Sequence, residues 1–142
     1  MAEALSLARR AGEEGEVPIG AVVVRDGVVI GRGWNRNIGL NDPTAHAEVM
    51  ALREAGANLG NHRLPGCSLY VTLEPCPMCV GAMIHARLAR LVYGATDPKT
   101  GAAGGVFDLL GNPAHNHAVA VAGGCLAEEC SVLLKDFFKK RR

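Results

Sequence analysis

The chain has 142 residues, of which 49% are hydrophobic and 20% charged, and its formal net charge of +1 excludes a global basic field. This composition indicates one folded domain over residues 1–142 rather than a disordered chain. No apolar run approaches the roughly 18 residues that a membrane helix needs, and the opening residues lack the apolar stretch of a signal peptide. We expect a cytoplasmic protein whose five cysteines are free thiols or metal ligands.

Apolar periodicity predicts a helix over 3–14, followed by a β-hairpin. The hairpin is indicated by β-branched runs at 22–24 and 28–30, which flank the tight-turn dipeptide Asp26-Gly27. The later predicted elements are a helix at 44–56, a strand at 67–73, a helix at 77–88, a strand at 90–95, a glycine-rich loop at 97–105, a short helix at 106–111, a strand at 118–122 and a helix from about 126 onward.

The alternation of helices and strands after the hairpin implies crossover connections and parallel strand pairing. The fold class expected is therefore α/β, with a mixed sheet of about five strands between helices and an antiparallel hairpin at its N-terminal side. Thr44 or Asp42 is the expected cap of the helix at 44–56, and Gly56 is its expected stop.

The segment "LEPCPMC" at 73–79 places Cys76 and Cys79 three residues apart, on one side of a predicted helix start. A helix N-terminus stabilises thiolates, and Pro77 is tolerated in the first turn. Taken alone, this Cys-x-x-Cys is compatible with a disulfide, a redox pair, a metal site or buried packing.

The segment "AHAEVM" adds His46 and Glu48. One histidine and two cysteines supply the three protein ligands of a catalytic zinc site, which keeps its fourth position for water. No second Cys-x-x-Cys completes a closed structural site, and the spacing of His115 and His117 does not favour a fourth ligand. Three other cysteines are interpreted as packing residues: Cys67, Cys125 and Cys130.

His-x-Glu followed by Pro-Cys-x-x-Cys resembles the signature of zinc deaminases. The resemblance implies that Glu48 shuttles protons beside a zinc-activated water. Thioredoxin-type chemistry is the competing interpretation of the cysteine pair, but it leaves His46 and Glu48 without a role.

A closer resemblance covers nearly the whole chain. The segments that carry it are "VPIGAVVV", "GWNRNIGLNDPTAHAEVMALR", "LYVTLEPCPMCVGAMIHARL", "VYGATDPKTGAAGG" and "LLKDFFKKRR". They are similar to bacterial tRNA-specific adenosine deaminases. This resemblance implies a three-layer α/β/α cytidine-deaminase-like fold, one zinc ion per subunit and a homodimer. The implied reaction is conversion of the wobble adenosine to inosine in a tRNA anticodon stem-loop, with arginine tRNA as the expected substrate.

Carried over by position, the resemblance assigns roles to ten residues. The implied zinc ligands are His46, Cys76 and Cys79, and the implied proton shuttle is Glu48. The implied substrate contacts are Asn35, Asp97, Lys99, Phe138, Arg141 and Arg142. Asn35 has an alternative role as a turn former at the end of a strand. Phe137, in the same C-terminal segment, could instead fill a groove of the core.

Two other functions remain open. One is deamination of a free base or nucleoside of the guanine or cytosine type at the same zinc site. The C-terminal "KDFFKKRR", with five basic groups and one acid, argues for a larger anionic substrate such as RNA. The other is a non-catalytic, zinc-stabilised binding module, which would require a closed site with four ligands.

Overall fold

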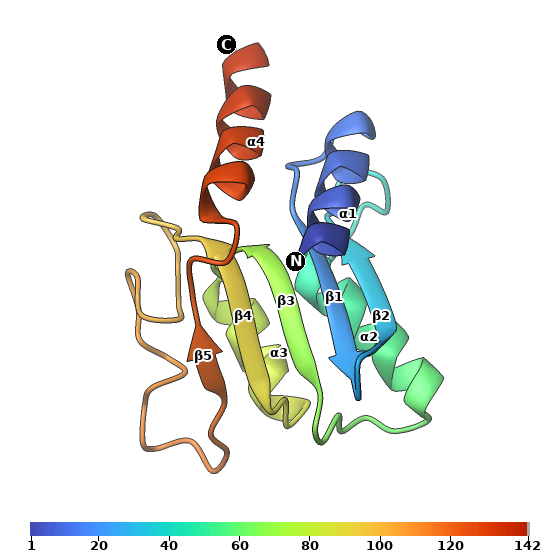
Figure 1. Cartoon of the computed structure of the whole chain (residues 1–142), viewed down its shortest axis with the longest axis vertical. Helices are drawn as coiled ribbons and strands as arrows, with labels where there is room; N and C mark the ends of the chain where they lie inside the picture. Colours follow the sequence, from blue (N-terminus) through green and yellow to red (C-terminus); the bar gives the residue numbers. More distant parts are fainter. Residues whose placement is uncertain (142) are drawn as a thin grey trace.

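The computed structural model describes residues 1–141, which form four helices and five strands (Figure 1). In chain order these are α1 (Ala2–Glu13), β1 (Gly20–Arg25), β2 (Val28–Trp34), α2 (Ala47–Leu59), β3 (Ser68–Leu73), α3 (Pro77–His85), β4 (Arg90–Ala95), β5 (Ala120–Ala122) and α4 (Ala127–Lys140). Within this described part, no helix combines the length and the apolar character of a membrane span.

The predicted hairpin is confirmed. β1 and β2 pair antiparallel, from Gly20 opposite Trp34 to Arg25 opposite Val28, with a bulge after Val23. Asp26 and Gly27 connect them with φ of 51° and 76°, the left-handed conformations that a tight two-residue hairpin turn requires.

The strand order in the sheet is β2-β1-β3-β4-β5. β1 is antiparallel to both β2 and β3, whereas the β3–β4 and β4–β5 pairs are parallel. The mixed five-stranded sheet is therefore confirmed, and a second antiparallel pair adds to the predicted one. Because β2 and β3 run in the same direction on either side of β1, α2 is a crossover that passes over β1.

The helices cover both faces of the sheet, which confirms the three-layer architecture (Figure 1). α2 and α3 pack on one face over the larger core cluster, which includes Leu69, Leu91 and Met83. α1 and α4 lie on the other face, where Leu5, Ala95 and Cys130 form a smaller cluster. Gly33 allows α2 to lie directly on β2, because a Cβ there would collide with the backbone of α2 at Ala47.

The prediction of a helix at 106–111 is wrong. Residues 103–108 instead form a turn, closed by an isolated bridge between Ala103 and Asp108 and by the Gly104 amide donating to the carbonyl of Phe107 at 2.9 Å. Gly104 has φ of 114°, a conformation that interrupts a helix. The glycines just before this segment thus favour a tight turn over the apolar periodicity of 106–110.

The expected ends of the helix at 44–56 are also wrong. α2 begins three residues later, with His46 as its N-cap, and continues through Gly56 to Leu59. Gly60 ends it in the left-handed conformation, with φ of 70°.

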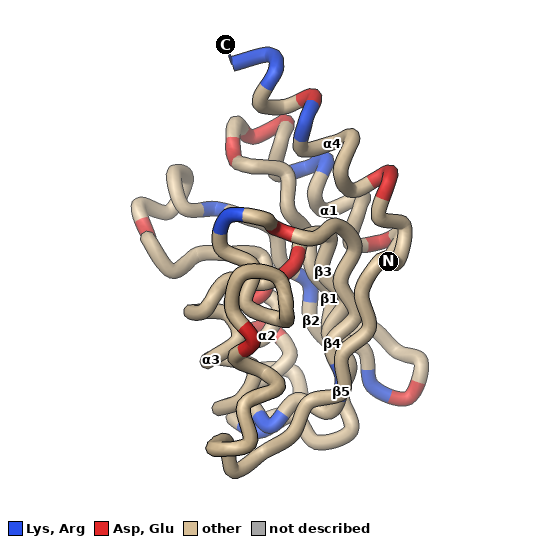
Figure 2. The backbone as a smooth tube through the Cα atoms, turned by 90° about the vertical axis from the view of Figure 1, so that its left-hand side faces the viewer, with Lys and Arg blue, Asp and Glu red and all other residues tan. Residues whose placement is uncertain are grey.

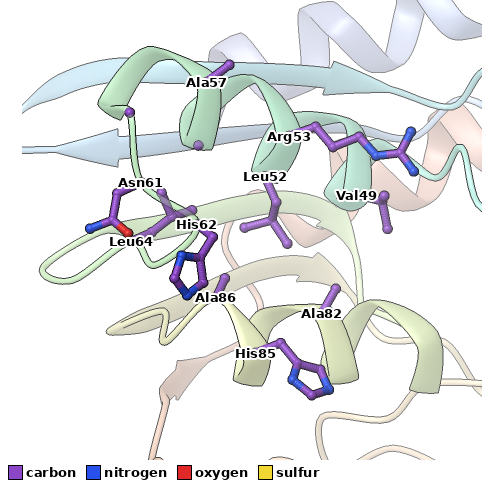
Figure 3. Close-up of a pocket in the computed structure, with 12 residues that line it drawn as sticks. Val49, Leu52, Arg53, Ala57, Asn61, His62, Leu64, Ala82, His85 and Ala86 are labelled. Carbon is purple, nitrogen blue, oxygen red and sulfur yellow. The ribbon is translucent and has the colours of Figure 1, made fainter.

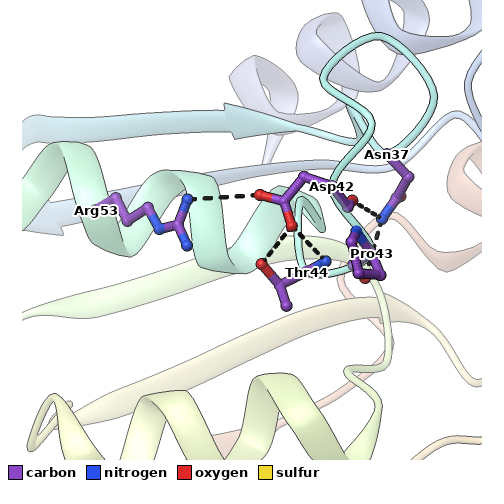
Figure 4. A network of polar contacts seen from close by, with 5 residues as sticks. All are labelled: Asn37, Asp42, Pro43, Thr44 and Arg53. Carbon is purple, nitrogen blue, oxygen red and sulfur yellow. Dashed lines mark hydrogen bonds and ion pairs between the residues drawn. The ribbon is translucent and has the colours of Figure 1, made fainter.

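Asp42 and Thr44 close the turn before α2 (Figure 4). Oδ1 of Asp42 accepts from the amide and the hydroxyl of Thr44 at 2.8 and 2.7 Å, and these bonds lower the pKa of Asp42. Nδ2 of Asn37 donates to the carbonyls of Asp42 and Pro43, and Arg53 lies 3.8 Å from Oδ2 of Asp42. The two expected caps therefore hold the turn that delivers His46 to the helix start.

Candidate metal centre

Two helix starts bring the predicted ligands together. His46 is the N-cap of α2, Cys76 is the N-cap of α3, and Cys79 lies in the first turn of α3 behind Pro77. α2 follows β2 and α3 follows β3, and these strands are parallel. Their carboxyl ends therefore meet at one edge of the sheet, where α/β proteins commonly place their sites.

The distances between the donor atoms fit zinc. Nδ1 of His46 lies 3.6 Å from Sγ of Cys76 and 3.5 Å from Sγ of Cys79. Zn–S bonds of about 2.3 Å and Zn–N bonds of about 2.0 Å at a tetrahedral angle separate sulfur from nitrogen by about 3.5 Å. Within residues 1–141, these three side chains are the one group of at least three such donors, all within 4.8 Å of one another.

The pKa values of the two thiols move in opposite directions. The hydrogen bond from Cys79 lowers the pKa of Cys76 to about 4, with a further contribution from His46. The same bond raises the pKa of Cys79, which is its donor. The bond to Cys76 also raises the pKa of His46. The lowered pKa of Cys76 favours the thiolate, which is the form of cysteine that binds zinc.

Glu48 lies at the second residue of α2, beside the three ligands but outside their cluster. It is buried, with 4% of its surface exposed. Burial raises the pKa of its carboxyl group, while His46 and Cys79 act in the opposite direction. A buried carboxyl group with a raised pKa beside a metal site suits proton transfer.

Asn35 provides the cap that Asp42 and Thr44 do not. Its Oδ1 accepts a hydrogen bond of 2.9 Å from the amide of Ala47, the first residue of α2, and its side chain is buried. The end of β2 thereby holds the helix start that carries His46 and Glu48. The preference of asparagine for turns at strand ends did not predict this hydrogen bond to an amide 12 residues away.

The predicted substrate contacts on the 97–105 loop and on α4 lie along one groove, about 990 Å³ in volume. The residues predicted from sequence that line it are Asp97, Lys99, Phe138 and Arg141. The groove also has basic side chains that the sequence analysis did not assign, Lys135 and Lys139. Blue segments at the C-terminal end of α4 mark this cluster in Figure 2. Arg142, also predicted, lies outside the described residues.

Several of these side chains have internal partners. Both oxygens of Asp97 accept hydrogen bonds within its own turn, from the amides of Lys99 and Thr100 and from the Thr100 hydroxyl. Arg141 donates to the carbonyl of Gly15 at 3.0 Å and lies over the ring of Phe137. Phe137 is half-buried, whereas Phe138 is 48% exposed.

Other histidines and cysteines lie away from the centre. Nε2 of His115 contacts the carbonyl of Leu109 at 2.6 Å, and Nε2 of His117 contacts that of Leu88 at 2.7 Å. The three remaining cysteines are free thiols; Cys67 and Cys130 are buried, whereas Cys125 is half-buried.

Two features were missed by the sequence analysis. The buried carboxylate of Glu16 accepts from the amides of Ile38 and Gly39, so it holds the loop that follows Asn35. A groove of about 710 Å³ separates α2 from α3 (Figure 3). Neither carried a local signal, because each depends on segments that only the fold brings together.

Comparison with known families identifies this centre. The family model described as "Cytidine and deoxycytidylate deaminase zinc-binding region" matches residues 1–95, which include the three ligands and Glu48. The chain belongs to this zinc-binding deaminase family.

Within the family, the chain is similar to a tRNA-specific adenosine deaminase of Haemophilus influenzae, at 53% identity over 100% of this chain and 83% of that protein. It is also 52% identical to part of a tRNA(Ile)-lysidine synthase of Deinococcus deserti; that match covers this whole chain but only 27% of the longer protein.

Solved structures agree with the family assignment. A structure from work on A-to-I editing by tRNA:A34 deaminases at the wobble position of transfer RNA aligns with a TM-score of 0.89 and 52% identity, over 92% of this chain and 95% of that one. A guanine deaminase from Nitrosomonas europaea aligns with a TM-score of 0.84 and 28% identity, over 96% and 81%. The zinc-binding deaminase fold is therefore shared by enzymes acting on RNA and on a free base.

Proposed function

We propose that this protein hydrolyses adenosine to inosine and ammonia at the wobble position of a tRNA anticodon. The observation that carries the proposal is a His-Cys-Cys donor set at zinc-binding distances beside buried Glu48. Over its whole length, the chain that carries this site is 53% identical to a tRNA-specific adenosine deaminase.

His46, Cys76 and Cys79 would hold the zinc ion. When bound, zinc would supply an activated water as the nucleophile at neutral pH. Glu48 accepts a proton from that water and delivers it to N1 of the adenine ring. The water oxygen would bond to C6, Glu48 would move the second proton of that water to the amino group on C6, and the C6–N bond would break to release ammonia. A single carboxyl group can serve both transfers because it returns to its starting state in each cycle.

Asn35 and the groove along α4 would hold the RNA. Oδ1 of Asn35 is committed to the start of α2, so a contact with the base falls to its Nδ2 amide. Lys99, Lys135 and Lys139 place positive charge along the groove, and the exposed ring of Phe138 is available for stacking on a base. An anticodon loop suits this arrangement because its bases are single-stranded. Turning one base out of its stack costs about a few kcal/mol.

The homodimer implied by the family resemblance is part of the proposal. The groove between α2 and α3 offers an apolar face that includes Val49, Leu52 and Ala82 (Figure 3). Sedimentation equilibrium of the zinc-loaded protein is expected to give twice the subunit mass of 14.9 kDa. A single-subunit mass at micromolar concentration would contradict the dimer.

Transcribed arginine tRNA is the first substrate to test. We expect inosine at the wobble position of a transcript with adenosine there, and no product from a matched transcript with guanosine. Free adenosine, guanine and cytosine should remain unchanged under the same conditions. Release of ammonia from a free base but not from tRNA would favour the second function, and zinc binding without any turnover would favour a binding module. A tRNA substrate is consistent with the proposed location of the protein in the cytoplasm.

A further inference from the structure

Glu74 is a second buried carboxylate near the metal centre, and the proposed chemistry does not use it. It follows β3 and precedes Pro75 and the ligand Cys76, and only 2% of its surface is exposed. A charge buried this deeply is costly unless hydrogen bonds compensate it.

Three backbone amides surround the Glu74 carboxylate. Oε1 accepts from the amide of Asp97 at 3.1 Å, and Oε2 accepts from the amides of Ala103 and Gly105 at 3.0 and 2.8 Å. All three donors belong to the 97–105 loop, more than 20 residues away along the chain. The carboxylate is therefore the centre around which this loop is wrapped.

Backbone bonds fasten the same two segments on either side of the carboxylate. The amide of Glu74 donates to the carbonyl of Ala95, and the amide of Ala102 donates to the carbonyl of Pro75, both at 2.8 Å. The 97–105 loop is thus attached to the short segment that ends at Cys76. The Ala102–Pro75 bond therefore holds the loop against the segment that leads to the metal centre.

The contact at Asp97 leads outward to the groove. Glu74 fixes the Asp97 amide, and the Asp97 carboxylate in turn orders the amides of Lys99 and Thr100. Lys99 is exposed and lines the groove along α4. A continuous chain of hydrogen bonds therefore runs from a residue beside a zinc ligand to a cation on the proposed RNA surface.

We propose that Glu74 is a positioning residue, whose buried carboxylate sets where the 97–105 loop meets RNA relative to the metal centre. This inference rests on the proposed function. Glu74 itself touches neither metal ligand nor substrate in this scheme. Its removal should therefore weaken RNA binding while the chemical step on bound RNA continues.

Glu74→Gln tests the proposal with little change in volume. A glutamine can keep its one oxygen toward the amides of Ala103 and Gly105, which leaves its NH2 group facing the Asp97 amide, donor against donor. We expect hydrogen exchange at the Asp97 amide to become at least about tenfold faster, as for a lost hydrogen bond. We expect the Kd for an anticodon stem-loop RNA to rise about tenfold, the factor typical of one charge-assisted bond.

Zinc content and the single-turnover rate at saturating RNA should stay within about threefold of the wild type, since neither the ligands nor Glu48 are altered. Glu74→Asp retains the charge and should restore part of the affinity. Glu16→Gln is the matched control, because it removes another buried carboxylate that holds a different loop. It should leave exchange in the 97–105 loop unchanged.

A second variant disturbs the same contact from the other side. A Cβ added at Gly105 would lie 2.6 Å from Oε1 of Glu74, so Gly105→Ala should push the loop away and reproduce the effects of Glu74→Gln. Wild-type exchange at Asp97 together with a wild-type Kd in both variants would overturn the proposal. So would a loss of zinc that accounts for the whole loss of RNA binding, because Glu74 would then be a purely structural residue.

The exchange measurement needs no RNA. If the wild-type protein deaminated no RNA, the proposed function would fail while the anchoring of the loop by Glu74 would still be measured.

Discussion

Glu48→Gln is expected to lower kcat on tRNA by about 10²- to 10⁴-fold, the usual contribution of a general acid–base group. The amide preserves the shape of the buried side chain but cannot accept a proton from water or deliver one to N1. Zinc content should remain at the wild-type level, because Glu48 lies outside the cluster of three donors. Rapid-quench measurement of inosine at saturating tRNA, with metal analysis of the same sample, checks both parts.

Glu54→Gln is the matched control for this variant. Glu54 lies on the same helix, six residues further on, and is exposed, so its loss should leave turnover unchanged. If Glu48→Gln retained turnover within a few-fold of the wild type, the proton would have to move through another group and the proposed role of Glu48 would be wrong.

Cys79→Ala is expected to abolish stable zinc binding and, with it, deamination. Two protein ligands would remain, one fewer than a catalytic zinc site uses. The melting temperature should fall as well, because metal binding to a folded site contributes directly to stability. Inductively coupled plasma analysis after dialysis against a chelator measures the metal, and scanning calorimetry with and without zinc measures the coupling.

Cys130→Ala separates the loss of a ligand from the loss of a buried thiol. Cys130 is buried to nearly the same degree as Cys79, with 1% and 0% exposed, but it packs on the opposite face of the sheet. The Cys130→Ala variant should keep its zinc, although the cavity left by the substitution should lower its free energy of unfolding. Full zinc occupancy in Cys79→Ala would show that Cys79 is not a ligand.

The candidate ligand set could be predicted from the sequence because its signals are local. Cys76, Pro77 and Cys79 occupy a helix start whose geometry follows from their spacing, and His46 with Glu48 forms a compact motif at another. The hairpin was equally local, since Asp26 and Gly27 define its turn. Local periodicity failed at 106–111, where glycines and a bridge between Ala103 and Asp108 outweighed an apolar run.

The supporting contacts were not accessible in this way. Asn35 accepts a hydrogen bond from the first amide of α2, 12 residues away. Glu74 accepts hydrogen bonds from amides that lie 23 to 31 residues away. Such bonds depend on which strands pair and on the direction in which each runs. The insertion of β1 between β2 and β3 brings β2 and β3 into the same direction and aligns the two helix starts.

The sequence by itself therefore determined the chemical elements of this protein: three candidate zinc donors, one carboxyl group proposed to transfer protons, a basic C-terminal segment and an α/β order of elements. Only the tertiary structure decided how these are held. It placed Asn35 at the start of α2, made Glu74 the anchor of the 97–105 loop and brought that loop beside α4. The physical reason is that donor identity is encoded residue by residue, whereas a buried hydrogen bond exists only where two distant segments meet.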